Sequence, residues 1–386
     1  MSAVPGVINE ALKAMRSEPA RAATLLRAAL QQDPRNFDAG LLLSEALRLV
    51  GDLPGARAVI APIATANPRH FGAQRQLGVI LAANGAALPS SLALRAAAEL
   101  NPAHPTIWRD LGDQLTLAGD SHGSQAAYLR HAASRTMDPA LVPAAEHLRA
   151  GNHAAAEALL QAHVRNHPTD IVALRMLGEA QARASATAEA EQTMRRIIAL
   201  APAFQPTRHD LTLMLNALGR TEDALQEARN LLAIDPKNVG SRRALAAVLN
   251  SAGEYDQALA IYDKLLEEDP TRAATWTTVG HIQKTLGDSE RSIEAYRRSI
   301  ALAPERGEAY WGLANLKTVR FTETEIASIR ALLGRNDLAP EARIDLFYTL
   351  GKALEQHRDV AGAFAAYSEG ASARSKKHRH DREQLS

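Results

Sequence analysis

The sequence contains no cysteine, few aromatic residues and no long apolar run. The lack of cysteine excludes disulfides, thiolate metal sites and cysteine nucleophiles. No stretch could span a bilayer, and the N-terminal residues lack the apolar core of a signal peptide. Neither sign of charge is in excess, because 44 Lys and Arg residues stand against 43 Asp and Glu residues. We therefore expect a cytoplasmic protein whose partners are neither nucleic acids nor membranes.

Alanine and leucine dominate the composition, whereas valine and isoleucine form no alternating runs. Because alanine and leucine are strong helix formers, this composition favours helices throughout and argues against a sheet. Arginine greatly outnumbers lysine, which together with the alanine content is typical of a GC-rich bacterial coding sequence.

Proline and glycine recur with a period of 34 residues. The prolines are Pro34, Pro68, Pro102, Pro168, Pro202, Pro236, Pro270 and Pro304. The glycines are Gly51, Gly85, Gly119, Gly151, Gly219, Gly253 and Gly287, with Ser185 in the one missing place. A glycine with positive φ ends a first helix and a proline follows a second, so each repeat is predicted to be two antiparallel helices. The proline series is two residues short between Pro102 and Pro168, and the glycine series is two residues short between Gly119 and Gly151. This indicates a two-residue deletion in one repeat.

Other positions of the repeat also hold one kind of residue. With proline numbered 32, position 20 is small, position 8 is often glycine, and aromatic residues occupy positions 4 and 24. The aromatic residues are Trp108, Trp276, Tyr128, Tyr262 and Tyr296. Because they recur at one phase, we interpret them as packing residues that fill the gaps between helices.

This pattern resembles the tetratricopeptide repeat (TPR), and its best match is TWTTVGHIQKTLGDSERSIEAYRRSIALAP, residues 275–304. The resemblance covers residues 1 to about 310 and implies an all-α fold, a right-handed superhelical solenoid of about ten to eleven helix-turn-helix repeats. The expected domains are a regular array of about nine repeats over 1–304, with the deletion within 137–151, a divergent repeat at 305–340, a last repeat at 341–372, and a basic tail or start of a linking helix at 373–386.

The resemblance also implies a concave groove lined by the first helix of each repeat, with positions 5 and 12 facing into it. The groove residues predicted in this way are Arg75, Arg109, Arg175, His209, Arg243, Asn216, Asn250, Lys284 and Trp311. Because guanidinium groups suit carboxylates, we expect a polypeptide ligand that is acidic or extended. The alternative for two of these arginines is pairing within their own helices, of Arg109 with Asp113 and of Arg175 with Glu179.

No catalytic signature occurs in the sequence. GxxxxGK[ST], GxGxxG, HExxH and GxSxG are all absent, so we expect no catalytic, cofactor or metal site within these residues. His378 and His380 are two residues apart and do not share a helical face. We interpret the basic run around them as a solvated helix or tail.

The repeat breaks at YWGLANLKTVRF, residues 310–321, where Phe321 stands in place of the expected glycine. Thr322 and Thr324 are candidate N-caps for a displaced second helix. Its predicted apolar stripe is Ile326, Ile329, Leu332 and Leu333, and it ends at Gly334.

Residues 305–380 are also similar to the junction region of bacterial TPR-linked sulfotransferases. The matching residues are Tyr310, Trp311, Leu313, Ala314, Asn315, Leu316, Lys317, Arg320, Phe321, Leu350, Gly351, Lys352, Ala353, Leu354, Glu355, Ala363, Phe364, Tyr367 and Gly370. The resemblance implies that a sulfotransferase domain using PAPS, the phosphosulfate donor, follows residue 386. Its PRSG[ST] phosphate-binding loop does not occur in this sequence, so no catalytic residue is carried over.

Two functions are therefore expected. The first is the N-terminal substrate-recognition region of a sulfotransferase, and the alternative is a stand-alone TPR adaptor for protein complex assembly or secretion. The reading frame beyond Ser386 distinguishes them. Self-association through unfilled grooves or solenoid ends is open in either case.

Overall fold

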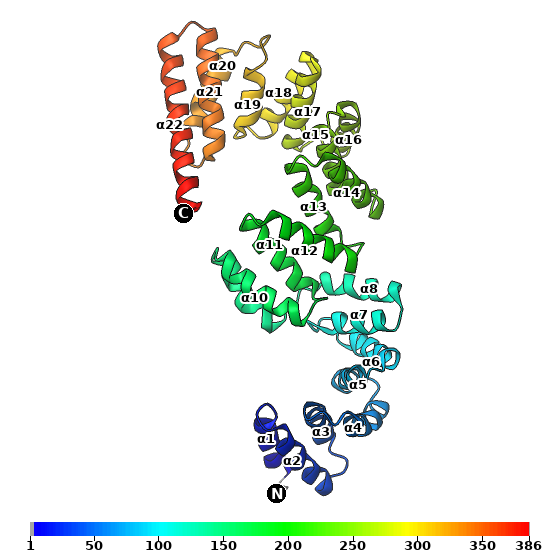
Figure 1. The fold of residues 1–386 in the computed structure, drawn as a ribbon. Helices are drawn as coiled ribbons and strands as arrows, with labels where there is room; N and C mark the ends of the chain where they lie inside the picture. The colour runs from blue at the N-terminus through cyan, green and yellow to red at the C-terminus, as the bar shows by residue number, and fades with distance from the viewer. Residues whose placement is uncertain (1–3, 386) are drawn as a thin grey trace. The chain divides into compact units, whose positions relative to one another are not determined.

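The computed structural model describes residues 4–385, with side chains for residues 5–377. The described part is helical without strands, which confirms the all-α prediction, and consecutive helices pair side by side (Figure 1). Contacts divide the chain into two compact units, Met1–Leu211 and Thr212–Ser386, which are called the N-terminal and C-terminal units below. No helix within residues 4–385 is long and apolar enough to cross a membrane.

The N-terminal unit contains twelve α-helices and one short 3-10 helix. They are α1 (Val4–Ala14), α2 (Pro19–Gln32), α3 (Phe37–Leu49), α4 (Leu53–Ala66), α5 (Phe71–Ala83), α6 (Ala87–Leu100), α7 (Ile107–Leu117), α8 (Ser121–Ala132), η1 (Pro139–Leu141), α9 (Val142–Arg149), α10 (His153–Asn166), α11 (Ile171–Arg183) and α12 (Thr187–Leu200).

Helix α13 (Gln205–Ala217) crosses the boundary between the units. The helices of the C-terminal unit that follow it are α14 (Thr221–Ile234), α15 (Val239–Ser251), α16 (Tyr255–Glu268), α17 (Ala273–Leu286), α18 (Ser289–Leu302), α19 (Gly307–Ala314), α20 (Glu323–Leu333), α21 (Pro340–Gln356) and α22 (Val360–Leu385). Odd-numbered helices are the first and even-numbered helices the second of each repeat.

The turns inside the repeats from α3/α4 to α17/α18 have the predicted left-handed residue. All seven glycines of the 34-residue series have φ between 70° and 85°. Ser185 takes the same conformation, with φ of 62°, although a side chain makes this region unfavourable. The turn geometry is therefore set by the repeat as a whole, and glycine is the residue that adopts it with least strain.

The predicted packing roles of the aromatic residues are confirmed for the buried ones. Tyr296 is fully buried, and a Cβ atom placed on Gly280 or Gly312 would lie only 2.7 or 2.5 Å from its ring. The glycine of one repeat and that of the next thus leave room for one tyrosine. The indole N–H of Trp108 donates to the Pro102 carbonyl over 2.9 Å and ties the proline turn to the next helix.

The repeat that carries the deletion is irregular. It begins with η1 and the eight-residue α9 in place of a full first helix. Helix α8 also contacts α11 and α12 directly, across this shortened repeat. Leu141 at the end of η1 is 1% exposed and belongs to the local core.

The divergent repeat is built differently from the others. Helix α19 has only eight residues, and it packs on α21 as well as on α17 and α18. Helix α20 begins at a capping box of Thr322 and Glu325 and ends before Gly334, as predicted. Thr324, the other candidate N-cap, lies inside the helix.

Side chains at the end of α21 hold the loop that replaces the glycine turn. Phe321 is 2% exposed, and its N–H donates to Gln356 Oε1 over 3.2 Å. The Phe321 carbonyl accepts from His357 Nε2, and Gln356 Nε2 donates to the Val319 carbonyl. These bonds pair backbone N–H and C=O groups of the loop that have no partner within a helix. The loop therefore keeps its backbone hydrogen bonds although phenylalanine stands in the place of glycine.

Candidate functional site

Four of the predicted groove residues lie in the N-terminal unit, on first helices. Arg75 is half-buried near Glu45, but Glu45 is already held by Arg48 and by Gln76. Arg175 is exposed and lies over the Phe204 ring, 5.2 Å from its centroid. His209 is half-exposed, with Nδ1 3.7 Å from Asp210.

The pairing expected within helices α7 and α11 does not form. Arg109 is only 8% exposed and donates to Asp170 over 2.9 Å, whereas Asp113 accepts from Tyr128 and Thr169. Glu179 lies 3.9 Å from Arg183, one turn away in the other direction from Arg175. Arg109 therefore differs from the other predicted groove residues, because its guanidinium group is paired with a buried carboxylate inside the fold.

Asp170 is the centre of a buried ion cluster that the sequence did not reveal. Its carboxylate is 1% exposed and accepts from Arg109, from Nε2 of both His131 and His163 over 3.0 Å, and from the backbone N–H of Ala173. An ionised carboxylate only accepts, so both histidines carry the proton on Nε2. The cluster joins α7, α8 and α10 to the N-terminus of α11.

The cluster stabilises the ionised form of Asp170. Burial alone would raise the pKa of Asp170, but hydrogen bonds from His131 and from the Ala173 N–H outweigh burial and lower the pKa well below its usual range. A helix N-terminus also favours a carboxylate at this place. Arg109 compensates the negative charge of Asp170. The cluster is therefore a structural ion network in which each oxygen of the Asp170 carboxylate accepts two hydrogen bonds.

The N-terminal unit should therefore lose stability in acid. Because the folded-state pKa of Asp170 is lowered, its contribution is complete above the unfolded value of about 3.9 and is lost as the pH falls from there towards the folded value. We expect the stability difference between wild type and Asp170→Asn to shrink between pH 5 and pH 2. Urea unfolding at several pH values measures it, and a constant difference would contradict the assignment.

The other five predicted residues lie on first helices of the C-terminal unit. Asn216, Arg243 and Asn250 are half-buried, and Lys284 is exposed. The Asn216 Oδ1 atom and the Arg243 Nε atom are buried without a hydrogen-bond partner among the described residues. Trp311 is half-buried and lies 5.4 Å from Lys352 Nζ, so it also packs against the next repeat.

Arg243 has a positive neighbour and no acidic one. Burial and the charge of Arg272 lower the pKa of Arg243. No ion pair joins either arginine to an acidic residue in the part of the chain that the structure describes. Arg272 is the N-cap residue of α17 and is exposed. The two guanidinium groups therefore form a cationic site on the first-helix side of the C-terminal unit.

Among residues 5–377, no group of three His, Cys, Asp or Glu residues could hold a metal ion. Around Asp170 the Nε2 atoms of His131 and His163 are both taken up by hydrogen bonds to the carboxylate. The side chains of His378 and His380 lie outside the described residues.

Family models described as tetratricopeptide repeat match residues 14–77 and 215–281, residues 144–203, and residues 273–306. Together these matches span more than half of the chain. Among solved structures, "MamA 41-end from Desulfovibrio magneticus RS-1" is 16% identical, over 42% of this chain and 92% of that chain, with a TM-score of 0.40. "Crystal Structure of the Yeast Tom70" is 12% identical, over 99% of this chain and 96% of that chain, also with a TM-score of 0.40. No curated protein matches.

The helix pairs, the left-handed residue between the two helices of each regular repeat and the matched residues agree with one another. The chain belongs to the tetratricopeptide repeat family.

Proposed function

We propose that the chain is a polypeptide-binding scaffold, and that the first helices of its C-terminal unit bind an acidic, extended peptide. Stacked helix pairs form extended surfaces of the kind that repeat proteins use for binding. The observation that carries the proposal is the pair Arg243 and Arg272, neither of which forms an ion pair with a described acidic residue.

The cost of this pair explains why a ligand is expected. A half-buried guanidinium group loses hydration and is further destabilised by a like charge. A carboxylate from outside would pair with the half-buried guanidinium group of Arg243 and offset both penalties. The two arginines thus select for acidic side chains.

Amide groups nearby suit the backbone of an extended chain. Asn216 is half-buried, and a side-chain amide can both donate to and accept from a peptide backbone. Asn250 and Lys284 occupy the same position in the next two repeats. A ligand that runs along the first helices would therefore meet amides as well as charges.

Binding of two matched peptides tests this proposal. We expect a fluorescein-labelled (Ser-Glu)₅ peptide to bind more tightly than (Ser-Gln)₅, because only the first offers carboxylates. Arg243→Ala should weaken (Ser-Glu)₅ by roughly tenfold or more, since a hydrogen bond to a charged group contributes about 1.5–3 kcal/mol. Fluorescence anisotropy at low salt measures both affinities.

The control is Arg229→Ala, which removes an exposed arginine from the second helix α14. It should leave both affinities unchanged. Equal binding of the two peptides would contradict the acidic preference, and no binding of either would contradict a peptide site on this surface.

The link to a sulfotransferase remains a prediction from the sequence. Several residues that carry the resemblance bond to one another inside the fold. Lys352 Nζ, for example, donates to Asn315 Oδ1 over 2.7 Å. These contacts give the residues a structural role with or without an attached enzyme. We therefore propose the scaffold function for this chain, and a PAPS-dependent domain or a stand-alone adaptor role as the two contexts for it.

A further inference from the structure

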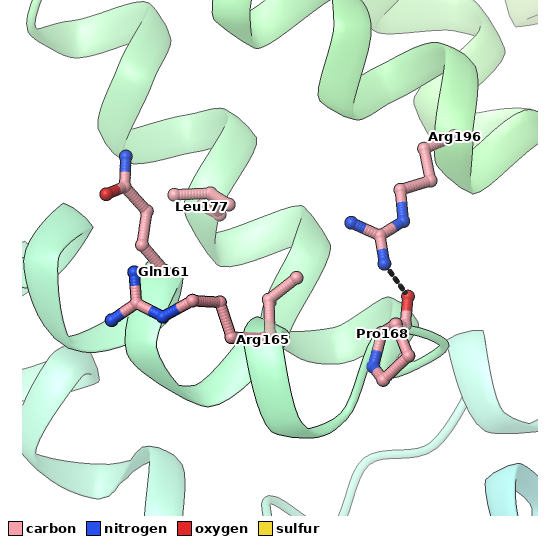
Figure 2. A pocket seen from close by; sticks show the side chains of 6 residues that line it. Gln161, Arg165, Pro168, Leu177 and Arg196 are labelled. Atoms are coloured by element: carbon pink, nitrogen blue, oxygen red, sulfur yellow. Dashed lines mark hydrogen bonds between the residues drawn. The ribbon is translucent and has the colours of Figure 1, made fainter.

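A cleft of about 400 Å³ opens on the second-helix side of the N-terminal unit, away from the predicted groove residues (Figure 2). It lies between α10 and α12, with α11 beneath. The lining residues are Gln161, Val164, Arg165, Pro168, Leu177 and Arg196. Val164 and Leu177 are almost fully buried, so they form an apolar floor of which only an edge is exposed.

Two arginines flank this floor. Figure 2 shows Arg165 on α10 and Arg196 on α12 on opposite sides of Leu177. Both are exposed, and neither forms an ion pair with a described residue. Arg196 donates to the Pro168 carbonyl, which fixes its guanidinium group at the edge of the cleft and leaves its other N–H groups available.

The acidic residue nearest to this cleft along α10 has other partners. Glu157 Oε1 accepts from Gln161 Nε2 over 3.0 Å and from Gln181 Nε2 over 3.4 Å. Gln161 is thus turned towards Glu157, and its amide does not block the floor. The cleft therefore combines a small apolar surface with positive charge on two sides.

We propose that this cleft binds an acidic segment of a partner polypeptide, with one aliphatic side chain on the floor and a carboxylate on each side. The aliphatic side chain covers the exposed edges of Val164 and Leu177. The flanking carboxylates pair with Arg165 and Arg196, which Figure 2 shows on opposite sides of Leu177. Charge complementarity thus selects an acidic-aliphatic-acidic sequence.

This site is separate from the Arg243 site, because it lies on second helices and in the other unit. A partner with two acidic segments could occupy both sites.

Methyl NMR of the full chain tests the cleft directly, since Val164 and Leu177 carry reporter methyl groups. The probe is the peptide Ac-Ser-Glu-Leu-Glu-Ser-NH₂. The comparison peptides replace both glutamates by glutamine, or the leucine by serine. We expect the methyl signals of Val164 and Leu177 to shift with the probe, and at least fivefold higher concentrations of either comparison peptide to be needed for the same shift.

Two single variants and a control complete the test. Arg165→Ala and Arg196→Ala should each weaken the probe several-fold, and both residues are exposed, so the fold should persist. Arg57→Ala, an exposed arginine of α4, should have no effect. The proposal is overturned if the Val164 and Leu177 signals do not move, or if the glutamine peptide binds as well as the probe. Shifts confined to methyl groups near Arg243 would assign the peptide to the other site alone.

Discussion

Replacing Asp170 by alanine is expected to lower the free energy of unfolding of the N-terminal unit by about 3–5 kcal/mol. The carboxylate accepts from Arg109, His131 and His163. Arg109 has a second acidic partner in Asp110, which is more exposed than Asp170. Removal leaves the buried guanidinium group of Arg109 with Asp110 as its one acidic partner and leaves the Nε2–H groups of both histidines unpaired. The cost therefore exceeds that of the lost attraction alone.

Urea unfolding followed by Trp108 fluorescence measures this effect. Because Trp276 and Trp311 are the other two tryptophans of the chain, a Trp276→Phe/Trp311→Phe background makes Trp108 the single reporter. Trp108 precedes Arg109 on α7 and lies in the affected unit.

Asp120 provides a matched control. It is also an N-cap aspartate, of α8, and accepts from the Gly123 N–H over 2.8 Å, but it is exposed. Asp120→Ala should cost only about 1 kcal/mol, the usual value for an N-cap. If both variants lost the same stability, Asp170 would act as a cap and the ion cluster would contribute nothing.

Tyr296→Ala is expected to destabilise the C-terminal unit by about 3–5 kcal/mol, the usual cost of truncating a large buried aromatic residue. Its ring fills the space left by Gly280 and Gly312, in its own repeat and in the next. The two glycines cannot fill this space, because they lack side chains. The cavity should therefore persist and loosen the contact of α18 with α19.

Tyr296→Phe separates the ring from the hydroxyl group. Burial raises the pKa of Tyr296 to about 12, and the neutral hydroxyl group shares a hydrogen bond with His281 Nδ1 over 2.7 Å. The phenylalanine variant keeps the ring and should cost only about 1 kcal/mol. Hydrogen exchange of the α17–α19 amides measures both variants. If the phenylalanine variant lost as much protection as the alanine variant, the hydrogen bond and not the packing would hold the repeats together.

The regular part of this fold could be predicted because the same residue types mark the helix ends in successive repeats. A glycine with positive φ and a proline after the second helix mark the helix ends, and the structure has them where the period places them. Ser185 shows the limit of this inference. The sequence marks it as a missing glycine, but only the structure shows that the turn keeps its left-handed geometry.

The ion cluster could not be predicted, because its members are far apart in the sequence. Arg109 and Asp170 are brought together where the irregular repeat lets α8 contact α11 directly. A local rule pairs Arg109 with Asp113 on the same helix, and that rule fails when a buried partner from another repeat is available. The only signal in the sequence was the two-residue deletion, which marks the place but not the contact.

The Asp170 cluster has a consequence for how this part of the chain opens. In most repeat proteins each repeat contacts only its neighbours, so local unfolding can start at one repeat and stop at the next. Here one carboxylate bonds to the repeat of α7 and α8, to α10 of the irregular repeat, and to the start of α11. None of the three can unfold without breaking bonds to Asp170. Residues 107–183 should therefore exchange their amides as one cooperative block within an otherwise modular array.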